Sequence, residues 1–177
     1  MSKIYESGRE IIFEGVELLF GSFRNFAGEK TKYNDSGKRN FNIQIDPDYI
    51  PFLMDKGINV KYFRADLDDE DQDEKPGFVK VNVNYGGLRA PEVFVRYGEK
   101  GKFVELNEDS IGKLDHAVFD SVDLVLNPSH WEARGDSGTS LYLNKGYFTI
   151  HVDPLAAKYE QAMNGRDIPD DTEELPF

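Results

Sequence analysis

Lysines, amides and aromatic rings alternate with apolar residues in three stretches of the chain, residues 40–45, 58–63 and 78–85. The alternating polar or aromatic set contains no carboxylate, although 33 of the 177 residues are acidic; it comprises Asn40, Asn42, Gln44, Asn59, Lys61, Phe63, Phe78, Lys80, Asn82 and Asn84. A lysine can neutralise a phosphate, an aromatic ring can stack on a base, and an amide can hydrogen-bond to either. The pattern favours binding of a polyanion with exposed bases. The alternative is an ordinary polar face with Phe63 or Phe78 packed under a loop.

A basic, glycine-containing segment, residues 24–41, leads into the first of these stretches. Lys30, Lys32, Lys38 and Arg39 can follow a phosphate backbone, and Tyr33 can stack on a base. The two glycines of the segment would let it bend around a bound chain. Phe26 and Phe41 are instead expected in the core, because Phe41 shares its face with Ile43 and Ile45.

Residue patterns typical of catalysis or metal binding are missing from the sequence. The acidic stretch from Asp66 has Asp71 and Gly77 where a calcium-binding EF-hand loop needs Gly and Glu. The three histidines lack the spacing of a zinc site, and the neighbouring Ser129 and His130 point to opposite faces of an extended chain. Neither glycine-rich phosphate-binding motif is present. We therefore expect a binding protein without enzymatic activity, cofactor or metal.

Acidic residues dominate the C-terminus, which runs Asp170-Asp171-Thr172-Glu173-Glu174-Leu175-Pro176-Phe177. A run of like charges repels itself and cannot bury enough apolar surface to fold. Residues 165–177 are therefore predicted to be a flexible tail, separate from a domain over residues 1–164. Its apolar, aromatic end would suit a partner protein with a basic and apolar pocket. The alternative is a loose terminus without a partner.

The net charge of −12 is unevenly distributed. Residues 66–75 hold seven carboxylates and one lysine, and residues 165–177 hold five carboxylates and one arginine, so the rest of the chain is nearly neutral. A nearly neutral body can carry a basic groove. Cysteine is absent, which excludes disulfides and zinc-thiolate sites. Acidic residues interrupt the apolar residues of the first 20 positions, so we expect neither a signal peptide nor a membrane span, and a cytoplasmic protein.

A period of two predicts strands over the three stretches above, over residues 93–97 and 122–126, and over a long segment from 139 to 152 with a bulge at Lys145-Gly146. Asp46-Pro47 and Asp153-Pro154 predict the starts of short helices, and residues 107–115 are a weaker helical candidate. The sequence therefore predicts a mainly β barrel or sandwich with short helical caps, with the acidic residues 66–75 inserted as a loop.

A resemblance to a known family covers roughly residues 20–150. Its first half is carried by Phe23-Arg24-Asn25-Phe26, Lys32-Tyr33-Asn34, Gly37, Arg39-Asn40-Phe41, Ile45-Asp46 and Asn59-Val60-Lys61-Tyr62; its second half by Leu88-Arg89-Ala90-Pro91, the segment from Leu106 to Leu114, Val122-Asp123-Leu124, Pro128 and Trp131. These residues resemble phage-encoded single-stranded DNA-binding proteins with an OB-fold, and the C-terminus is similar to the acidic tip of bacterial and phage proteins of this kind. The resemblance implies a Greek-key OB barrel that binds single strands with little sequence preference, and a tail that contacts replication or recombination proteins. The acidic residues 66–75 depart from the family pattern.

We therefore expect a single-stranded DNA-binding protein of phage type that protects DNA in replication, recombination and repair. We expect it to act in the host cytoplasm, where it could assemble as a homo-oligomer. The predicted DNA contacts are Lys30, Lys32, Tyr33, Lys38, Arg39, Lys61, Phe63, Phe78, Lys80, Arg89, Arg96 and Tyr142. The sequence leaves two roles for Trp131: packing in the core, which is the more common role of a tryptophan, and stacking on a base. The alternative function is an acidic protein that mimics DNA or sequesters a basic host protein.

Overall fold

The computed structural model describes residues 2–63, 74–155 and 158–159. Its strands are β1 (Lys3–Ser7), β2 (Glu10–Glu14), β3 (Glu17–Leu18), β4 (Arg24–Asn25), β5 (Arg39–Ile45), β6 (Lys61–Tyr62), β7 (Gly77–Val83), β8 (Glu92–Tyr97), β9 (Val104–Leu106), β10 (Phe119–Ala133) and β11 (Asp136–Ile150). Its helices are α1 (Ile50–Asp55) and the short 3-10 helices η1 (Gly21–Phe23), η2 (Pro47–Tyr49) and η5 (Ile111–His116).

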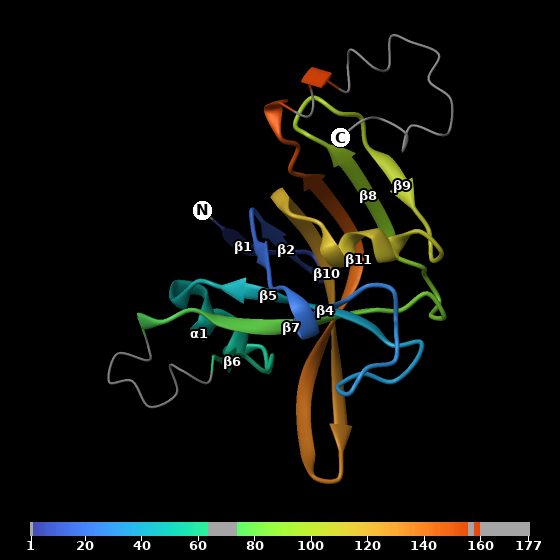
Figure 1. Ribbon diagram of the computed structural model, residues 1–177. Helices are drawn as coiled ribbons and strands as arrows, with labels where there is room; N and C mark the ends of the chain where they lie inside the picture. Colours follow the sequence, from blue (N-terminus) through green and yellow to red (C-terminus); the bar gives the residue numbers. More distant parts are fainter. Residues whose placement is uncertain (1, 64–73, 156–157, 160–177) are drawn as a thin grey trace.

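The strands form one sheet that closes on itself (Figure 1). The path runs β2, β10, β11, β7, β5 and β3, and β7 pairs with β11 in parallel while the other neighbours along this path are antiparallel. β2 and β3 flank Gly15, where φ is +63°, so one bent segment pairs with β10 on one side and with β5 on the other. This is the five-stranded, partly open Greek-key barrel of an OB-fold, as expected.

The barrel core is built from the inward-facing set of each strand. Phe13, Phe41, Val81, Leu124 and Phe148 are all at most 1% exposed and belong to one hydrophobic cluster. Phe26 also lies in this cluster and stacks on Phe41, with ring centroids 4.7 Å apart, which confirms the expectation that both rings are core. The opposite faces of the strands are therefore the outer surface of the barrel.

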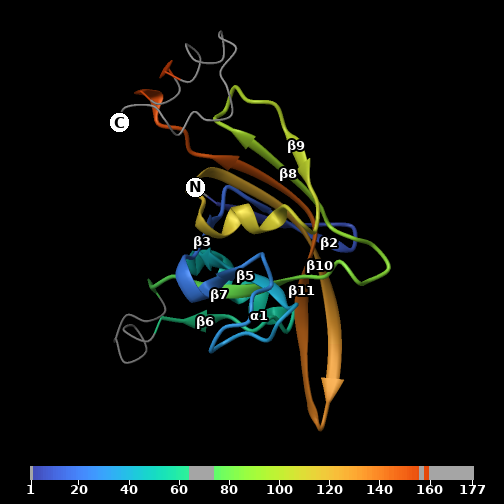
Figure 2. The same ribbon diagram turned by 45° about the vertical axis from the view of Figure 1, so that its right-hand side comes forward.

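Two extensions change the simple barrel. β10 and β11 continue past it as a long hairpin, residues 127–140, which we call the arm; it projects from the barrel in both views (Figures 1 and 2). At the other end of β11, the hairpin of β8 and β9 adds two strands to the sheet. Between the two extensions β11 carries the predicted bulge, where the register against β10 shifts opposite Val125 and Leu126.

The predicted strands are all present, although β6 is short, and η2 with α1 forms the helix expected after Asp46. Residues 111–116 form a 3-10 helix in place of the weaker helical candidate. The sequence did not predict β1, β2, β3, β4 and β9. Most of the acidic residues 66–75, the tail from 165 to 177 and most of the helix expected after Asp153 lie outside the described residues. Within the described part of the chain, no helix is both long and apolar enough to span a membrane.

Candidate nucleic-acid interface

The amides and lysines predicted to share one face do lie side by side on the outer surface of the barrel. Asn40 of β5 pairs with Asn82 of β7, and Asn82 pairs with Tyr142 of β11. One step along the strands, Asn42 lies opposite Lys80; the next step brings together Gln44, Phe78 and Lys61. We call these eight residues the amide face. It combines two cations with amides and aromatic rings and contains no carboxylate.

The turn of η1 covers one end of the amide face. The Asn42 side chain donates a hydrogen bond to the Phe23 carbonyl (2.9 Å), and the Phe23 ring meets the Phe78 ring edge-on at 5.2 Å. Phe63 contacts the other side of Phe78 at 5.0 Å. Phe78 is therefore only 8% exposed and lies under its neighbours, as the alternative interpretation held. Phe63, which is partly buried, and Phe23, which is 38% exposed, are the rings of this cluster that remain accessible to a base.

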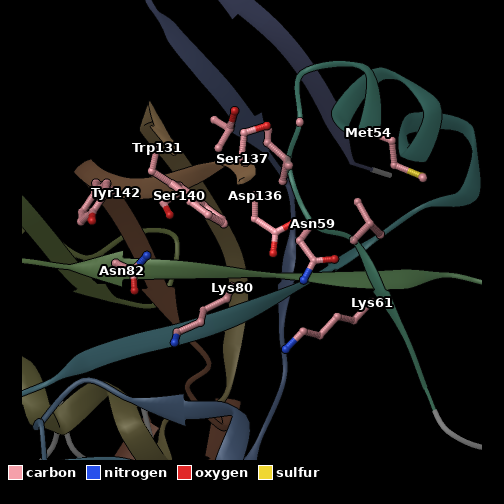
Figure 3. A pocket seen from close by; sticks show the side chains of 15 residues that line it. Met54, Asn59, Lys61, Lys80, Asn82, Trp131, Asp136, Ser137, Ser140 and Tyr142 are labelled. Carbon is pink, nitrogen blue, oxygen red and sulfur yellow. The ribbon is translucent and has the colours of Figure 1, made fainter. Parts of the chain in front are cut away.

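The open part of the amide face is the floor of a hollow of about 880 Å³. Lys61, Lys80, Asn82 and Tyr142 line it together with the arm, and Figure 3 shows both lysines extending to the same side. Asp136, at the turn of the arm, is the one carboxylate among the described residues that line the hollow. This hollow, which we call the groove, carries net positive charge, because two lysines and one aspartate line it.

Trp131 is part of the wall that the arm gives to this groove, not part of the core. It is 44% exposed and pairs across the arm with Gly138, whose lack of a side chain lets the indole ring lie against the backbone. The arm is fixed at its base, because Thr139 Oγ1 donates to the Lys56 carbonyl (2.6 Å) and the Thr139 amide donates to the Gly57 carbonyl (2.9 Å). The sequence signal for this role was the glycine seven residues after the only tryptophan.

The basic loop, residues 28–38, borders the Asn40 edge of the amide face. It is pinned and not free to bend, because the Asn34 side chain donates to the carbonyls of Glu29, Asp35 and Lys38, and Asn40 Nδ2 donates to Asn34 Oδ1 (3.0 Å). At its outer end Tyr33 is 74% exposed, and Lys32 Nζ lies 5.7 Å from the centre of its ring. Lys30 is exposed, and Lys38 forms an exposed ion pair with Asp35 (3.6 Å).

A buried arginine anchors the base of this loop. Arg24 is 5% exposed, and its guanidinium donates to the carbonyls of Leu18, Leu19, Leu114 and Ala117. Burial lowers the pKa of Arg24 below its ordinary value, while the charge of Asp115 acts in the opposite direction. Asp115 in turn accepts hydrogen bonds from the amides of Phe26 and Ala27, so η5 and the start of the loop are held together.

Three predicted arginine contacts lie outside the groove. Arg39 is on the core side of β5, where it donates a hydrogen bond to the Phe26 carbonyl (2.7 Å) and forms an ion pair with Glu108 (3.7 Å). Its guanidinium also lies over the Tyr85 ring, so these contacts hold Arg39 within the protein. Arg89 is exposed in the connection between β7 and β8, and Arg96 is on β8. The structure thus brings together Lys61, Lys80, Phe63 and Tyr142, with the loop carrying Lys30, Lys32, Tyr33 and Lys38 at one edge.

The described residues contain no group of three or more histidine, aspartate or glutamate side chains placed to hold a metal ion. The amide face instead lies where OB-folds bind oligonucleotides, on the face of the second and third barrel strands between the loop after the first strand and the loop between the last two. Here those strands are β5 and β7, and the two loops are the basic loop and the arm.

The fold is also found in solved structures. The single-stranded DNA-binding protein from bacteriophage Enc34, in complex with single-stranded DNA, superposes with a TM-score of 0.52 at 12% identity, over 84% of this chain and 90% of that chain. A C-terminal truncation of the same phage protein gives a TM-score of 0.50 at 14% identity, over 84% and 89% of the two chains. At these identities the likeness establishes the fold. No curated protein sequence matches the chain.

The family comparison covers nearly all of the sequence. The model of the family described as the putative phage ssDNA-binding domain matches residues 1–174. That range includes every strand of the barrel, the basic loop and the arm. The chain therefore belongs to the phage single-stranded DNA-binding domain family.

Proposed function

We propose that this protein binds single-stranded DNA in the groove, with little sequence preference and without catalysis. The observation that carries the proposal is the carboxylate-free amide face, on which Lys61 and Lys80 lie among amides beside Tyr142. Lysine contacts with phosphates and ring contacts with bases are both independent of sequence. The family membership and the Enc34 protein, solved with single-stranded DNA, support the same function.

Trp131, on the arm wall of the groove, and Tyr33, on the basic loop beyond the Asn40 edge of the amide face, extend this proposal past the floor of the groove. Both rings are exposed, one on the arm and one on the basic loop. A strand lying across β5 and β7 would pass between them, with its phosphates toward Lys61, Lys80 and the loop lysines. Accessible rings on both sides favour unpaired bases over a duplex, whose bases are already stacked on one another.

We further propose that residues 165–177 recruit replication or recombination proteins. The support is in the sequence: five carboxylates precede an apolar end, Leu175-Pro176-Phe177, which suits a basic and apolar pocket on a partner. In this arrangement the domain over residues 1–164 protects DNA, and the tail provides the contacts with other proteins.

Titration with labelled oligonucleotides tests the function. We expect tighter binding to a mixed-sequence single strand than to the matching duplex, and a logarithmic affinity that falls with the logarithm of salt by about 0.7 for each phosphate contacted. Trp131, the only tryptophan, provides a second signal, because a base stacked on it should quench its fluorescence. Equal affinity for duplex, or no binding at low salt, would show that the proposed function is wrong.

A further inference from the structure

The outer surface of the barrel continues from the groove onto β8. β10 occupies one edge of β11 along its whole length, so β7 and β8, which both pair with β11 in parallel, follow each other along the other edge. Beyond the bulge, the outward residues of β11 are Lys145, Tyr147 and Thr149, opposite Glu92, Phe94 and Arg96 of β8. Tyr147 comes about 15 Å after Tyr142 at the spacing of a strand.

Three aromatic rings are gathered on this continuation. The rings of Phe94 and Tyr147 stack with centroids 5.4 Å apart and an interplanar angle of 15°, and Phe103 meets Tyr147 edge-on at 5.7 Å. Phe103 is 41% exposed. The Arg96 guanidinium lies 4.7 Å over the Phe103 ring and is held by Thr149 Oγ1 (2.8 Å) and the Glu99 carbonyl (2.9 Å). The cation and the rings are therefore fixed relative to one another before any ligand arrives.

The charge around these rings is also suited to phosphate. Residues 94–103 carry Arg96, Lys100 and Lys102 against one acid, Glu99, in a protein whose net charge is −12. Lys100 and Lys102 are exposed at the turn between β8 and β9.

Four carboxylates lie around the same face, and three of them are engaged: Glu10 accepts a hydrogen bond from the Asn144 side chain, and Glu92 and Asp123 have partners as follows. Glu92 pairs with Lys145 (3.3 Å), and the hydrogen bond and charge of Glu92 raise the pKa of that lysine. Asp123 accepts a hydrogen bond from the Gly15 amide (2.9 Å). Glu105, opposite Phe94 in the register, is the fourth. The turn between β8 and β9 is thus the positive end of the face.

We propose that the β8–β9 hairpin is a second contact site for the same DNA strand, which leaves the groove along β11 and meets Phe103, Arg96, Lys100 and Lys102. This rests on the proposed function, because the strand must first occupy the groove. OB-folds occupy between about 4 and about 16 nucleotides, a range that allows for one site or for both. The groove would then hold a short oligonucleotide by itself, and the hairpin would add affinity only for a longer one.

The test measures the affinity of the full-length protein for oligothymidines of about 6 and about 16 nucleotides, near the two ends of that range. Lys100→Ala with Lys102→Ala should weaken binding of the long oligonucleotide several-fold at low salt and lower its salt slope by about 0.7 per lost contact, leaving the short one unchanged. Phe103→Ala should weaken only the long one, with its slope unchanged. Lys3→Ala with Arg9→Ala is the matched control: it removes two exposed cations near β1, which β2 and β10 separate from β11.

The outcomes separate the two proposals. If the unaltered protein binds neither oligonucleotide, the proposed function is wrong. If it binds both, the second site is refuted when the lysine variant weakens both lengths equally, weakens neither, or matches the control. If the affinity is unchanged in Phe103→Ala as well, the second site is refuted and a protein partner becomes the better explanation of this surface.

Discussion

In the proposed complex, lysines contact phosphates through their charge and aromatic rings stack on bases. Lys61 and Lys80 are exposed cations on the amide face, so their contacts should be with phosphates. We expect Lys61→Ala with Lys80→Ala to weaken single-strand binding and to reduce the salt slope by about 1.4, or 0.7 for each contact. Titrations at several salt concentrations measure both. The variant Lys3→Ala with Arg9→Ala removes the same charge elsewhere, and an equal effect from it would mean that only net charge matters.

Phe63 should behave differently from the lysines. It lies outside Phe78 at the edge of the aromatic cluster, and removing a stacking ring typically costs about 1 to 3 kcal/mol of binding. We expect Phe63→Ala to weaken binding by that amount with no change in salt slope, because no charge is lost. Circular dichroism of the variant is the control. A loss of folded structure would show that Phe63, like Phe78, serves mainly to pack the sheet.

At the scale of elements, Arg24 links the β4 region to η5. Each hydrogen bond from a charged group contributes about 1.5 to 3 kcal/mol to the stability of a protein. Arg24→Ala would remove the guanidinium that donates to the carbonyls of Leu114 and Ala117. We expect a loss of about 3 kcal/mol in the free energy of unfolding, measured with urea. Lys30→Ala, in the exposed part of the same segment, should change it by less than about 0.5 kcal/mol. Equal stability of the two variants would contradict this role.

The arm can be tested through the contact between its two strands. A Cβ atom on residue 138 would lie 2.7 Å from Trp131 Cζ2 and 2.9 Å from Cε2, so in Gly138→Ala the indole ring must move away. Because the ring is partly in solvent, we expect the fold to be retained while single-strand affinity and fluorescence quenching both decrease. Ser129→Ala, an exposed position on the arm that does not line the groove, should change neither. Full quenching and unchanged affinity in the Gly138 variant would show that binding does not depend on how the indole ring lies against residue 138, and an absence of quenching in the unaltered protein would show that Trp131 does not stack on a base.

The elements that could be predicted from the sequence are those with one buried and one exposed face. β5, β7 and β8 alternate in sequence between apolar residues and polar or aromatic ones, although Asn42 and Phe78 on the outer face are covered by the turn of η1, and the bulge in β11 was visible as a change of face at Lys145-Gly146. β1 was missed because Ile4 is its only buried residue, which leaves no period to detect. The arm has no apolar face, so the only local signal for the position of Trp131 is Gly138, and that glycine explains how the ring lies on the arm but does not place the arm beside the groove. The buried state of Arg24 depends on carbonyls about 90 residues away, which no local pattern reveals.

For the whole molecule, the uneven charge is the main feature that would link the two proposed functions, DNA binding and the recruitment of protein partners. The groove is positive, whereas residues 165–177 carry five carboxylates and one arginine and are tethered to the same chain. A flexible segment of about a dozen residues keeps its end within a few tens of ångströms, at an effective concentration that approaches millimolar. The tail should therefore compete with DNA for the cations of the groove, and bound DNA should release it to partner proteins.

Deletion of residues 167–177 tests this competition. We expect the deletion to tighten single-strand binding, most strongly at low salt, where charges are least screened. Phe177→Ala removes the aromatic end without removing charge, so it should leave DNA affinity almost unchanged and abolish capture of replication proteins in a pull-down. Replacing the tail carboxylates by amides while keeping Phe177 is the matched variant, which should tighten DNA binding as the deletion does. Weaker DNA binding after the deletion, or full partner capture by the Phe177 variant, would show that the tail does not couple the two.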